Sequence, residues 1–199
     1  MGTTNLKVCI YDENAVELAS ASRKCDTQYT DTGGALQSPE QWWANFVSAL
    51  TELRQHTAGM QCRSICISSH VPALIALAED GSVLYPAMIW QDYSGVQEAA
   101  ELEANYTSLL RRNNPSKVQP YHFIAKLLWF MRHEPELYQK TWKFVQPKDY
   151  LNFKLTGKAF LDEAQCGVNH FYNLFEHRFD PELAAAVDPA LLEKLPEVV

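Results

Sequence analysis

The spacing of apolar and polar positions changes along the chain, and each spacing predicts a different element. Residues 6–12 (LKVCIYD) and 16–24 (VELASASRK) alternate with a period of two around the turn-prone ENA, which predicts a β-hairpin. Residues 63–70 (RSICISSH) also alternate and are rich in isoleucine, so we predict a buried strand there. The chain therefore begins with strands.

A second hairpin is predicted within residues 73–90, where Asp80-Gly81 separates two apolar runs. A short strand at residues 142–146 (WKFVQ) is the last one that the pattern favours.

Helical spacing first appears after Ser38, a plausible N-cap that is followed by Pro39 at the first helical position. Gln41 then completes the pattern of a capping box. We expect one apolar stripe on this helix, made of residues at helical spacing: Trp43, Phe46, Val47, Leu50 and Leu53.

Later segments are mostly helical. Residues 97–112 form one predicted helix, and residues 121–133 form another, which must end before Pro135. A helix beginning at Pro147 and Asp149 should stop at Gly157, and two short helices begin at the Asp-Pro pairs in residues 180–196. The helix predicted over residues 121–133 presents one apolar face: Ile124, Leu127, Leu128 and Met131.

This mixed order of hairpins, strands and helices predicts an α/β layer fold with an antiparallel edge. At 199 residues, 47% hydrophobic and 21% charged, the chain fits one globular domain or two small ones. The net charge of -7 and the scattered basic residues argue against a nucleic-acid partner. No apolar run is long enough to span a bilayer and no leader pattern is visible, so we expect a cytoplasmic protein without a membrane partner.

The five cysteines are odd in number and match no disulfide framework. Cys62, Cys66 and His70 are spaced by four, which would suit metal ligands on a helix, but the segment alternates like a strand. We therefore expect buried, reduced thiols.

Gly2, Thr3 and Thr4 precede the first predicted strand. A glycine lets main-chain amides approach a phosphate closely, and the hydroxyls add donors. Taken alone, the same three residues could form an ordinary tight turn.

A series of motifs along the chain favours the phosphate-binding interpretation of this turn. From Gly2 to Val199 the chain resembles, in order and spacing, the N-terminal domain of the FGGY family of carbohydrate kinases. The series is GTTNLKVCIYDEN, SPEQWW, ICISSH, EDGSVLYPAMIWQD, KLLWFMRHEPELY, PKDYLNFKLTG and LPEVV. KLLWFMRH matches half of a family signature, although Phe123 stands where a small hydroxylated residue or proline is preferred.

The resemblance implies a ribonuclease H-like domain of the actin and hexokinase type: a mixed sheet with an antiparallel hairpin edge and flanking helices. In the family, two such domains close on a cleft, with the sugar mainly on the first and ATP mainly on the second. Residues 1–199 would be the first, sugar-binding domain, in incomplete form, with the ATP-binding domain absent.

The family turn reads D-x-G-T-T, and Met1 occupies the x position, so the resemblance implies that the first strand and its aspartate are missing. Relatives also continue beyond LPEVV into the catalytic-base aspartate. We therefore expect no catalytic residue, no metal ligand and no kinase turnover in this chain alone. The edges flanking the missing strand should be re-paired, filled by another chain or left open.

For nucleotide and phosphate binding, the resemblance points to Gly2, Thr3, Thr4 and Lys7, although a solvent-facing strand lysine is an equal alternative for Lys7. The intact protein would use ATP and Mg²⁺.

For sugar binding it points to Trp90 and Asp92, since an indole stacks on the apolar face of a sugar and a carboxylate accepts hydroxyl bonds. His70 could face the cleft or be a structural histidine, and Tyr121 lies near a position that contacts the polyol in glycerol kinases. The sequence departs from the family where Val71 and Pro72 replace a substrate-reading Met-His pair, and where Tyr93 and Ser94 replace an arginine after Asp92.

The predicted function is therefore part of an ATP-dependent kinase for a sugar or polyol, with homo-oligomerisation as a further expectation. The alternative is a degenerate, non-catalytic kinase half that binds a sugar or a partner protein.

Overall fold

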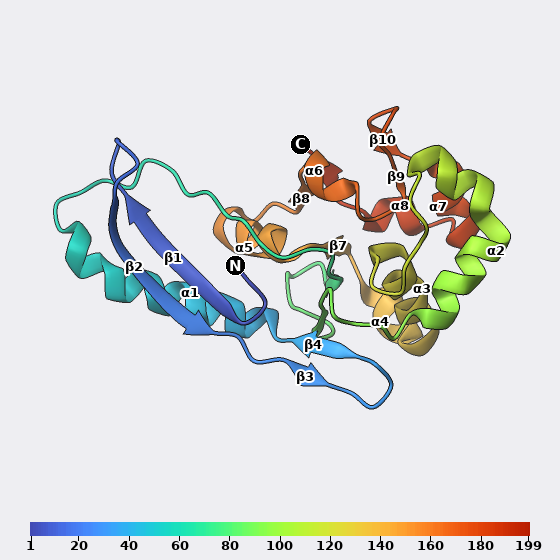
Figure 1. Ribbon diagram of the computed structural model, residues 1–199, viewed down its shortest axis with the longest axis horizontal. Coiled ribbons are helices and arrows are strands. Elements are labelled where there is room, and N and C mark those ends of the chain that lie inside the picture. The colour runs from blue at the N-terminus through green and yellow to red at the C-terminus, as the bar shows by residue number, and fades with distance from the viewer.

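The computed structural model describes residues 1–199, with a hairpin at one end and most helices at the other (Figure 1). The predicted hairpin forms from β1 (Asn5–Tyr11) and β2 (Glu17–Lys24), paired antiparallel. Its turn is held by the Asp12 carboxylate, which accepts the main-chain N–H groups of Asn14 and Val16, both at 2.9 Å. This hairpin packs on α1 (Figure 1).

Helix α1 (Pro39–Leu53) begins as predicted, with Ser38 as N-cap: the Ser38 hydroxyl accepts the Gln41 N–H at 3.1 Å. The predicted capping box is wrong, however. The Gln41 side chain turns away to the Asp26 main-chain N–H and carboxylate, at 3.0 Å each. The helix is thereby tied to the strand end that precedes it.

The predicted apolar stripe of α1 is confirmed at Phe46 and Leu53 and wrong at Val47 and Leu50. The helix buries Trp42 rather than Trp43, and both Val47 and Leu50 are exposed. The reason is a partner just before the helix, because the Trp42 indole N–H donates to the buried Gln37 Oε1 at 2.9 Å and fixes the helix rotation. The buried positions are Pro39, Trp42, Phe46, Ala49 and Leu53.

The predicted strand at residues 63–70 is wrong. After a short 3-10 helix, η1 (Arg54–Thr57), residues 61–73 lie outside any strand, and β1 pairs only with β2. Met1 bonds to this stretch without forming a ladder: its amino group donates to the Ser68 carbonyl, and its own carbonyl accepts the His70 N–H at 3.0 Å. Because no neighbouring strand pairs with residues 63–70, their β-propensity alone does not make them a strand.

The prediction of buried cysteines is wrong for the same stretch. Cys62 and Cys66 are exposed in a segment that pairs with no strand, whereas Cys25 and Cys166 are buried as expected and Cys9 is half-buried. All five thiols are free.

Short sheets, rather than one continuous sheet, connect the middle of the chain. The second hairpin is confirmed: Leu74 pairs with Met88, and Gly81 adopts φ +80 at its tip. The tip is tight, since a Cβ on Gly81 would meet the Phe153 ring at 2.6 Å. One sheet has the order β3 (Gln28–Tyr29), β4 (Ala35–Gln37), β6 (Ala87–Met88), and another pairs β5 (Ile75–Leu77) with β7 (Lys143–Val145).

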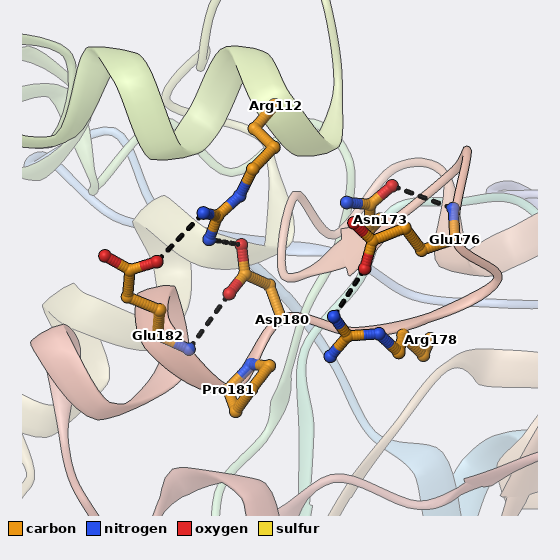
Figure 2. Close-up of a pocket in the computed structure, with 7 residues that line it drawn as sticks. All are labelled: Arg112, Asn173, Glu176, Arg178, Asp180, Pro181 and Glu182. Carbon is orange, nitrogen blue, oxygen red and sulfur yellow. Dashed lines mark hydrogen bonds and ion pairs between the residues drawn. The ribbon is translucent and has the colours of Figure 1, made fainter.

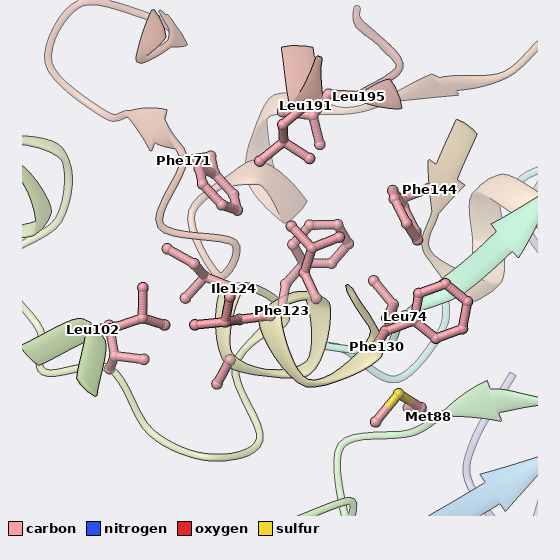
Figure 3. Packing of buried hydrophobic residues seen from close by; sticks show 14 of the residues in the cluster. Leu74, Met88, Leu102, Phe123, Ile124, Phe130, Phe144, Phe171, Leu191 and Leu195 are labelled. Atoms are coloured by element: carbon pink, nitrogen blue, oxygen red, sulfur yellow. The ribbon is translucent and has the colours of Figure 1, made fainter. Parts of the chain in front are cut away.

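The larger of two main cores lies among the helices and is drawn in Figure 3. It is built around α2 (Val96–Asn113) and α3 (Phe123–His133), with α4 (Pro135–Lys140) alongside. Helix α3 is buried on most of its surface, including Lys126, which is 0% exposed. Its predicted apolar face is confirmed for Ile124, Leu127 and Leu128, and Met131 packs at the edge.

The chain ends in short elements around this core. Helix α5 (Pro147–Thr156) stops at Gly157 with φ +73, as predicted. Asp180 caps the helix that begins at Pro181. None of the helices is both long and apolar enough to cross a bilayer. The remaining elements are β8 (Phe160–Leu161), α6 (Glu163–Cys166), β9 (Tyr172–Asn173), β10 (Arg178–Phe179), α7 (Pro181–Val187), α8 (Leu191–Lys194) and β11 (Glu197–Val198).

Candidate functional site

Two stretches that are 87 residues apart in sequence meet at a cleft. The Trp90 indole N–H donates to the Thr3 hydroxyl at 2.7 Å, which joins the N-terminal turn to the turn after β6. The cleft has a volume of about 620 Å³. Its lining residues are Thr3, Thr4, Lys24, Cys25, Asp26, Thr27, Tyr29, Trp90 and Gln91.

The N-terminal turn is fixed by main-chain bonds on three sides. The Gly2 N–H donates to the Asn5 carbonyl at 3.0 Å, the Thr3 carbonyl accepts Gln37 Nε2 at 2.8 Å, and the Thr4 carbonyl accepts the Cys25 N–H at 2.8 Å. The Thr3 hydroxyl accepts from Trp90 and keeps its own proton free to donate. This turn therefore offers a positioned donor to a ligand oxygen.

Trp90 and Asp92 share a turn but differ in their surroundings. Trp90 is 40% exposed at the cleft, whereas Asp92 is fully buried and does not line the cleft. The Asp92 carboxylate accepts the Ala35 N–H at 2.8 Å and the Ser94 N–H at 3.1 Å. In this structure Asp92 holds the turn in place, and Trp90 presents its indole to the cleft.

Six of the nine cleft residues were missed by the reasoning from sequence, and Tyr29 and Gln91 are the two that lie beside Trp90. Tyr29, at the end of β3, donates its hydroxyl proton to Gln91 Oε1 at 3.2 Å. The one available signal was an aromatic residue in an otherwise polar stretch, residues 26–33. Tyr29 and Gln91 add an aromatic ring and an amide beside Trp90.

The charged residues at the rim are paired with their neighbours. Lys24 lies 3.0 Å from the Asp26 carboxylate, and hydrogen bonds from Lys24 and Gln41 hold the pKa of Asp26 below its usual value. Burial raises the pKa of the Cys25 thiol, which therefore stays protonated. The groups left available to a ligand are hydroxyls, amides and aromatic faces.

His70 and Tyr121 lie near this region without lining the cleft. The His70 ring packs edge-on against Trp42 at 5.8 Å, and burial lowers its pKa to about 4, so the ring is neutral at physiological pH. The Tyr121 ring packs edge-on against the Tyr93 ring, with 5.8 Å between the two ring centres. Tyr93 lies in the turn that carries Trp90 and ends at Gly95.

Lys7 is not brought to the cleft. It lies on β1 with its side chain more than half exposed, 3.6 Å from the Glu17 carboxylate on β2. The structure thus groups Thr3, Thr4 and Trp90, with Gly2 and Asp92 supporting them, and places Lys7 on the hairpin.

A second, smaller cavity of about 130 Å³ lies beneath the end of α2 (Figure 2). Its charged groups bind one another: Arg112 contacts Asp180 at 2.6 Å and Glu182 at 2.8 Å, and Arg178 pairs with Glu176. The chain has no group of three or more His, Cys, Asp or Glu side chains arranged to hold a metal ion.

Residues 1–199 match the sequence profile described as the FGGY family of carbohydrate kinases, N-terminal domain. The chain belongs to the FGGY family. Among curated relatives, this FGGY domain is 24% identical over 203 residues to the xylulose kinase of Staphylococcus xylosus; the match covers 100% of the domain and 41% of the relative. The domain thus spans about two fifths of that relative's length.

Solved structures agree. The gluconate kinase of Lactobacillus acidophilus superposes with a TM-score of 0.91 at 26% identity, covering 100% of the FGGY domain and 40% of that chain. The xylulose kinase of Rhodospirillum rubrum gives the same TM-score and identity, with 100% and 42% coverage. The actin and hexokinase-type fold class expected from the sequence is confirmed.

Proposed function

We propose that this domain is the sugar-binding part of a kinase that transfers the terminal phosphoryl group of ATP to a hydroxyl of a sugar or polyol. The observation that carries the proposal is the Trp90–Thr3 hydrogen bond, because it places an exposed indole and a free hydroxyl proton side by side at a cleft of about 620 Å³. These are the two predicted binding stretches.

The chemistry of the cleft suits a neutral polyhydroxylated ligand. The Trp90 and Tyr29 rings offer apolar faces for the C–H face of a sugar, and the Thr3 hydroxyl and Gln91 amide offer hydrogen bonds to its hydroxyls. Since the rim charges are paired with each other, little free charge is available to bind a strongly ionic ligand. The relatives named as xylulose kinases make xylulose the first compound to test.

The phosphate and metal parts of the reaction fit this chain unequally. The free proton of the Thr3 hydroxyl suits a phosphate oxygen of ATP as well as a sugar oxygen. Mg²⁺ does not fit, since no carboxylate cluster for a cation is present among residues 1–199. We therefore assign no step to a metal and propose sugar binding, with ATP as the phosphoryl donor of the whole reaction.

The direct test is calorimetry of the 199-residue chain with xylulose, gluconate and glycerol, the substrates named for its relatives and structural neighbours. We expect saturable binding of one of them that is lost in Trp90→Ala, because this change removes the indole face from the cleft. A matched control is Phe175→Ala, which removes an exposed ring outside the cleft.

An assay of ADP release with ATP and the bound sugar separates binding from turnover. We expect binding without ADP release from this chain, since its carboxylates form no cluster that could bind a cation. The proposal is contradicted if the folded chain binds none of the three compounds, or if Trp90→Ala and Phe175→Ala lose binding equally.

A further inference from the structure

A lysine lies inside the helical core and directly beneath the candidate site. Lys126 is 0% exposed, and its ammonium group donates to three main-chain carbonyls. The distances are 3.2 Å to Pro72, 3.3 Å to Met88 and 2.5 Å to Ile89. No carboxylate lies within hydrogen-bond distance of it.

These carbonyls come from two separate segments. Pro72 belongs to the chain that precedes β5, whereas Met88 ends β6 and Ile89 begins the turn that carries Trp90 and Asp92. The Ile89 carbonyl also accepts the Asp92 N–H at 2.9 Å. The Lys126 ammonium therefore shares an acceptor with the first hydrogen bond of the site turn.

Burying an ammonium group in an apolar core is costly, and an unbranched apolar side chain would fill the same space without that cost. Burial lowers the pKa of Lys126 to about 7, with the nearby charge of Asp92 acting to raise it. The other titratable groups that feel this charge are His70 and His122, whose pKa values burial lowers to about 4. They are neutral in the range where Lys126 changes charge.

We propose that Lys126 is a positioning residue for the candidate site: by drawing the Pro72, Met88 and Ile89 carbonyls to one point, it fixes the turn that presents Trp90 to the cleft. The proposal concerns the geometry of the turn and holds whichever ligand the cleft binds. Sequence reasoning assigned no role to this lysine, although it stands within KLLWFMRH, the stretch that carries the family signature.

The chain supplies a matched control in Lys143. Its ammonium group also donates to main-chain carbonyls, of Glu193 at 2.6 Å and Leu195 at 2.9 Å, and burial likewise lowers its pKa. These carbonyls lie in and after α8, away from the cleft.

The test compares ¹⁵N NMR spectra of the full chain for Lys126→Met and Lys143→Met. In Lys126→Met we expect the Trp90 indole and Asp92 main-chain N–H signals to move, and the Asp92 N–H to exchange with D₂O about tenfold faster. In Lys143→Met both signals should stay in place. A folded Lys126→Met protein with both signals unchanged overturns the proposal.

A pH titration gives the second readout, which needs no ligand and no loss of fold. In the wild-type chain the Trp90 and Asp92 signals should move with a midpoint near pH 7, where Lys126 loses its charge. Lys126→Arg keeps the charge throughout this range, so it should abolish that titration, and Lys143→Met should retain it. If Lys126→Met does not fold, this comparison decides: a wild-type chain without the titration, or a midpoint near 7 that persists in Lys126→Arg, contradicts the proposal.

Discussion

The two cavities described above contain polar side chains in opposite states. In the cavity beneath α2, Arg112 binds Asp180 and Glu182, so the charges there satisfy one another (Figure 2). In the cleft between the N-terminal turn and β6, the Thr3 hydroxyl keeps a free proton and the Trp90 indole keeps an exposed face. The comparison teaches that paired charge holds helices together, while neutral groups with remaining capacity are the ones available to a ligand.

The largest effect on stability should come from removing the Asp180 carboxylate from the cavity beneath α2. This buried carboxylate caps α7 by accepting the Glu182 and Leu183 N–H groups and also binds Arg112. We expect Asp180→Ala to lower the free energy of unfolding by about 3 kcal/mol, measured by urea denaturation, because a helix cap and a buried acceptor are lost together. Sugar binding at the distant cleft should be unchanged in the folded protein.

Low pH sharpens the same prediction. Burial raises the pKa of the Asp180 carboxyl, but bonds from Arg112 and the Leu183 N–H outweigh it and the net shift is downward. A lowered pKa stabilises the fold above the unfolded value of 3.8 and loses this contribution as pH falls through the folded value. The wild-type chain should therefore lose more stability between about pH 5 and 2 than Asp180→Ala does; equal losses would show that the carboxylate contributes nothing.

Asp92→Ala should have the next largest effect, of about 2 kcal/mol, because the buried Ala35 N–H and the Ser94 N–H lose their acceptor. Unlike Asp180→Ala, it should also abolish sugar binding in calorimetry, since the turn that holds Trp90 loses its support. Asp92→Asn keeps one acceptor oxygen and should fall between. If Asp92→Ala binds sugar as well as the wild-type chain does, the support that Asp92 gives to this turn is not needed for binding.

A smaller effect is expected from Thr3→Val, which keeps the shape of the side chain and removes the acceptor of the Trp90 indole. We expect a loss of about 1 kcal/mol in unfolding free energy and about tenfold weaker sugar binding by calorimetry. Thr4→Val is the matched control, because Thr4 also lines the cleft and its hydroxyl does not bind Trp90. Equal losses in both variants would contradict a special role for Thr3.

The smallest effect should come from Glu182→Gln. Glu182 is largely exposed, and Arg112 keeps Asp180 as its partner, so urea denaturation should resolve no change. A clear destabilisation would mean that the paired cavity acts as a three-membered network rather than through Asp180 alone.

Features set by neighbouring residues in sequence were predictable. The first hairpin, the Ser38 and Asp180 caps and the stop at Gly157 each depend on a few adjacent residues, and all are confirmed. The strand at residues 63–70 was predicted wrongly because a strand also needs a partner, which no local pattern supplies.

The candidate site shows the same division. Thr3 and Trp90 were reached through a resemblance that spans the chain, and the structure places them in contact. Tyr29, Gln91 and Lys126 were missed because their roles depend on contacts between segments far apart in sequence, such as the bond from Lys126 to Ile89. The rotation of α1 was predicted wrongly for a different reason: apolar spacing alone does not show that Trp42 bonds to Gln37, and this bond decides which tryptophan is buried.

The free side of β1 has a consequence for the behaviour of the protein in concentrated solution. A strand that is paired on one side only exposes a row of main-chain donors and acceptors to which a second molecule can add its own strand. Lysines on such strands oppose this kind of self-association, because pairing two copies edge to edge brings like charges together. Lys7, which does not reach the cleft, is an exposed lysine on this strand, with Glu17 as its partner on β2.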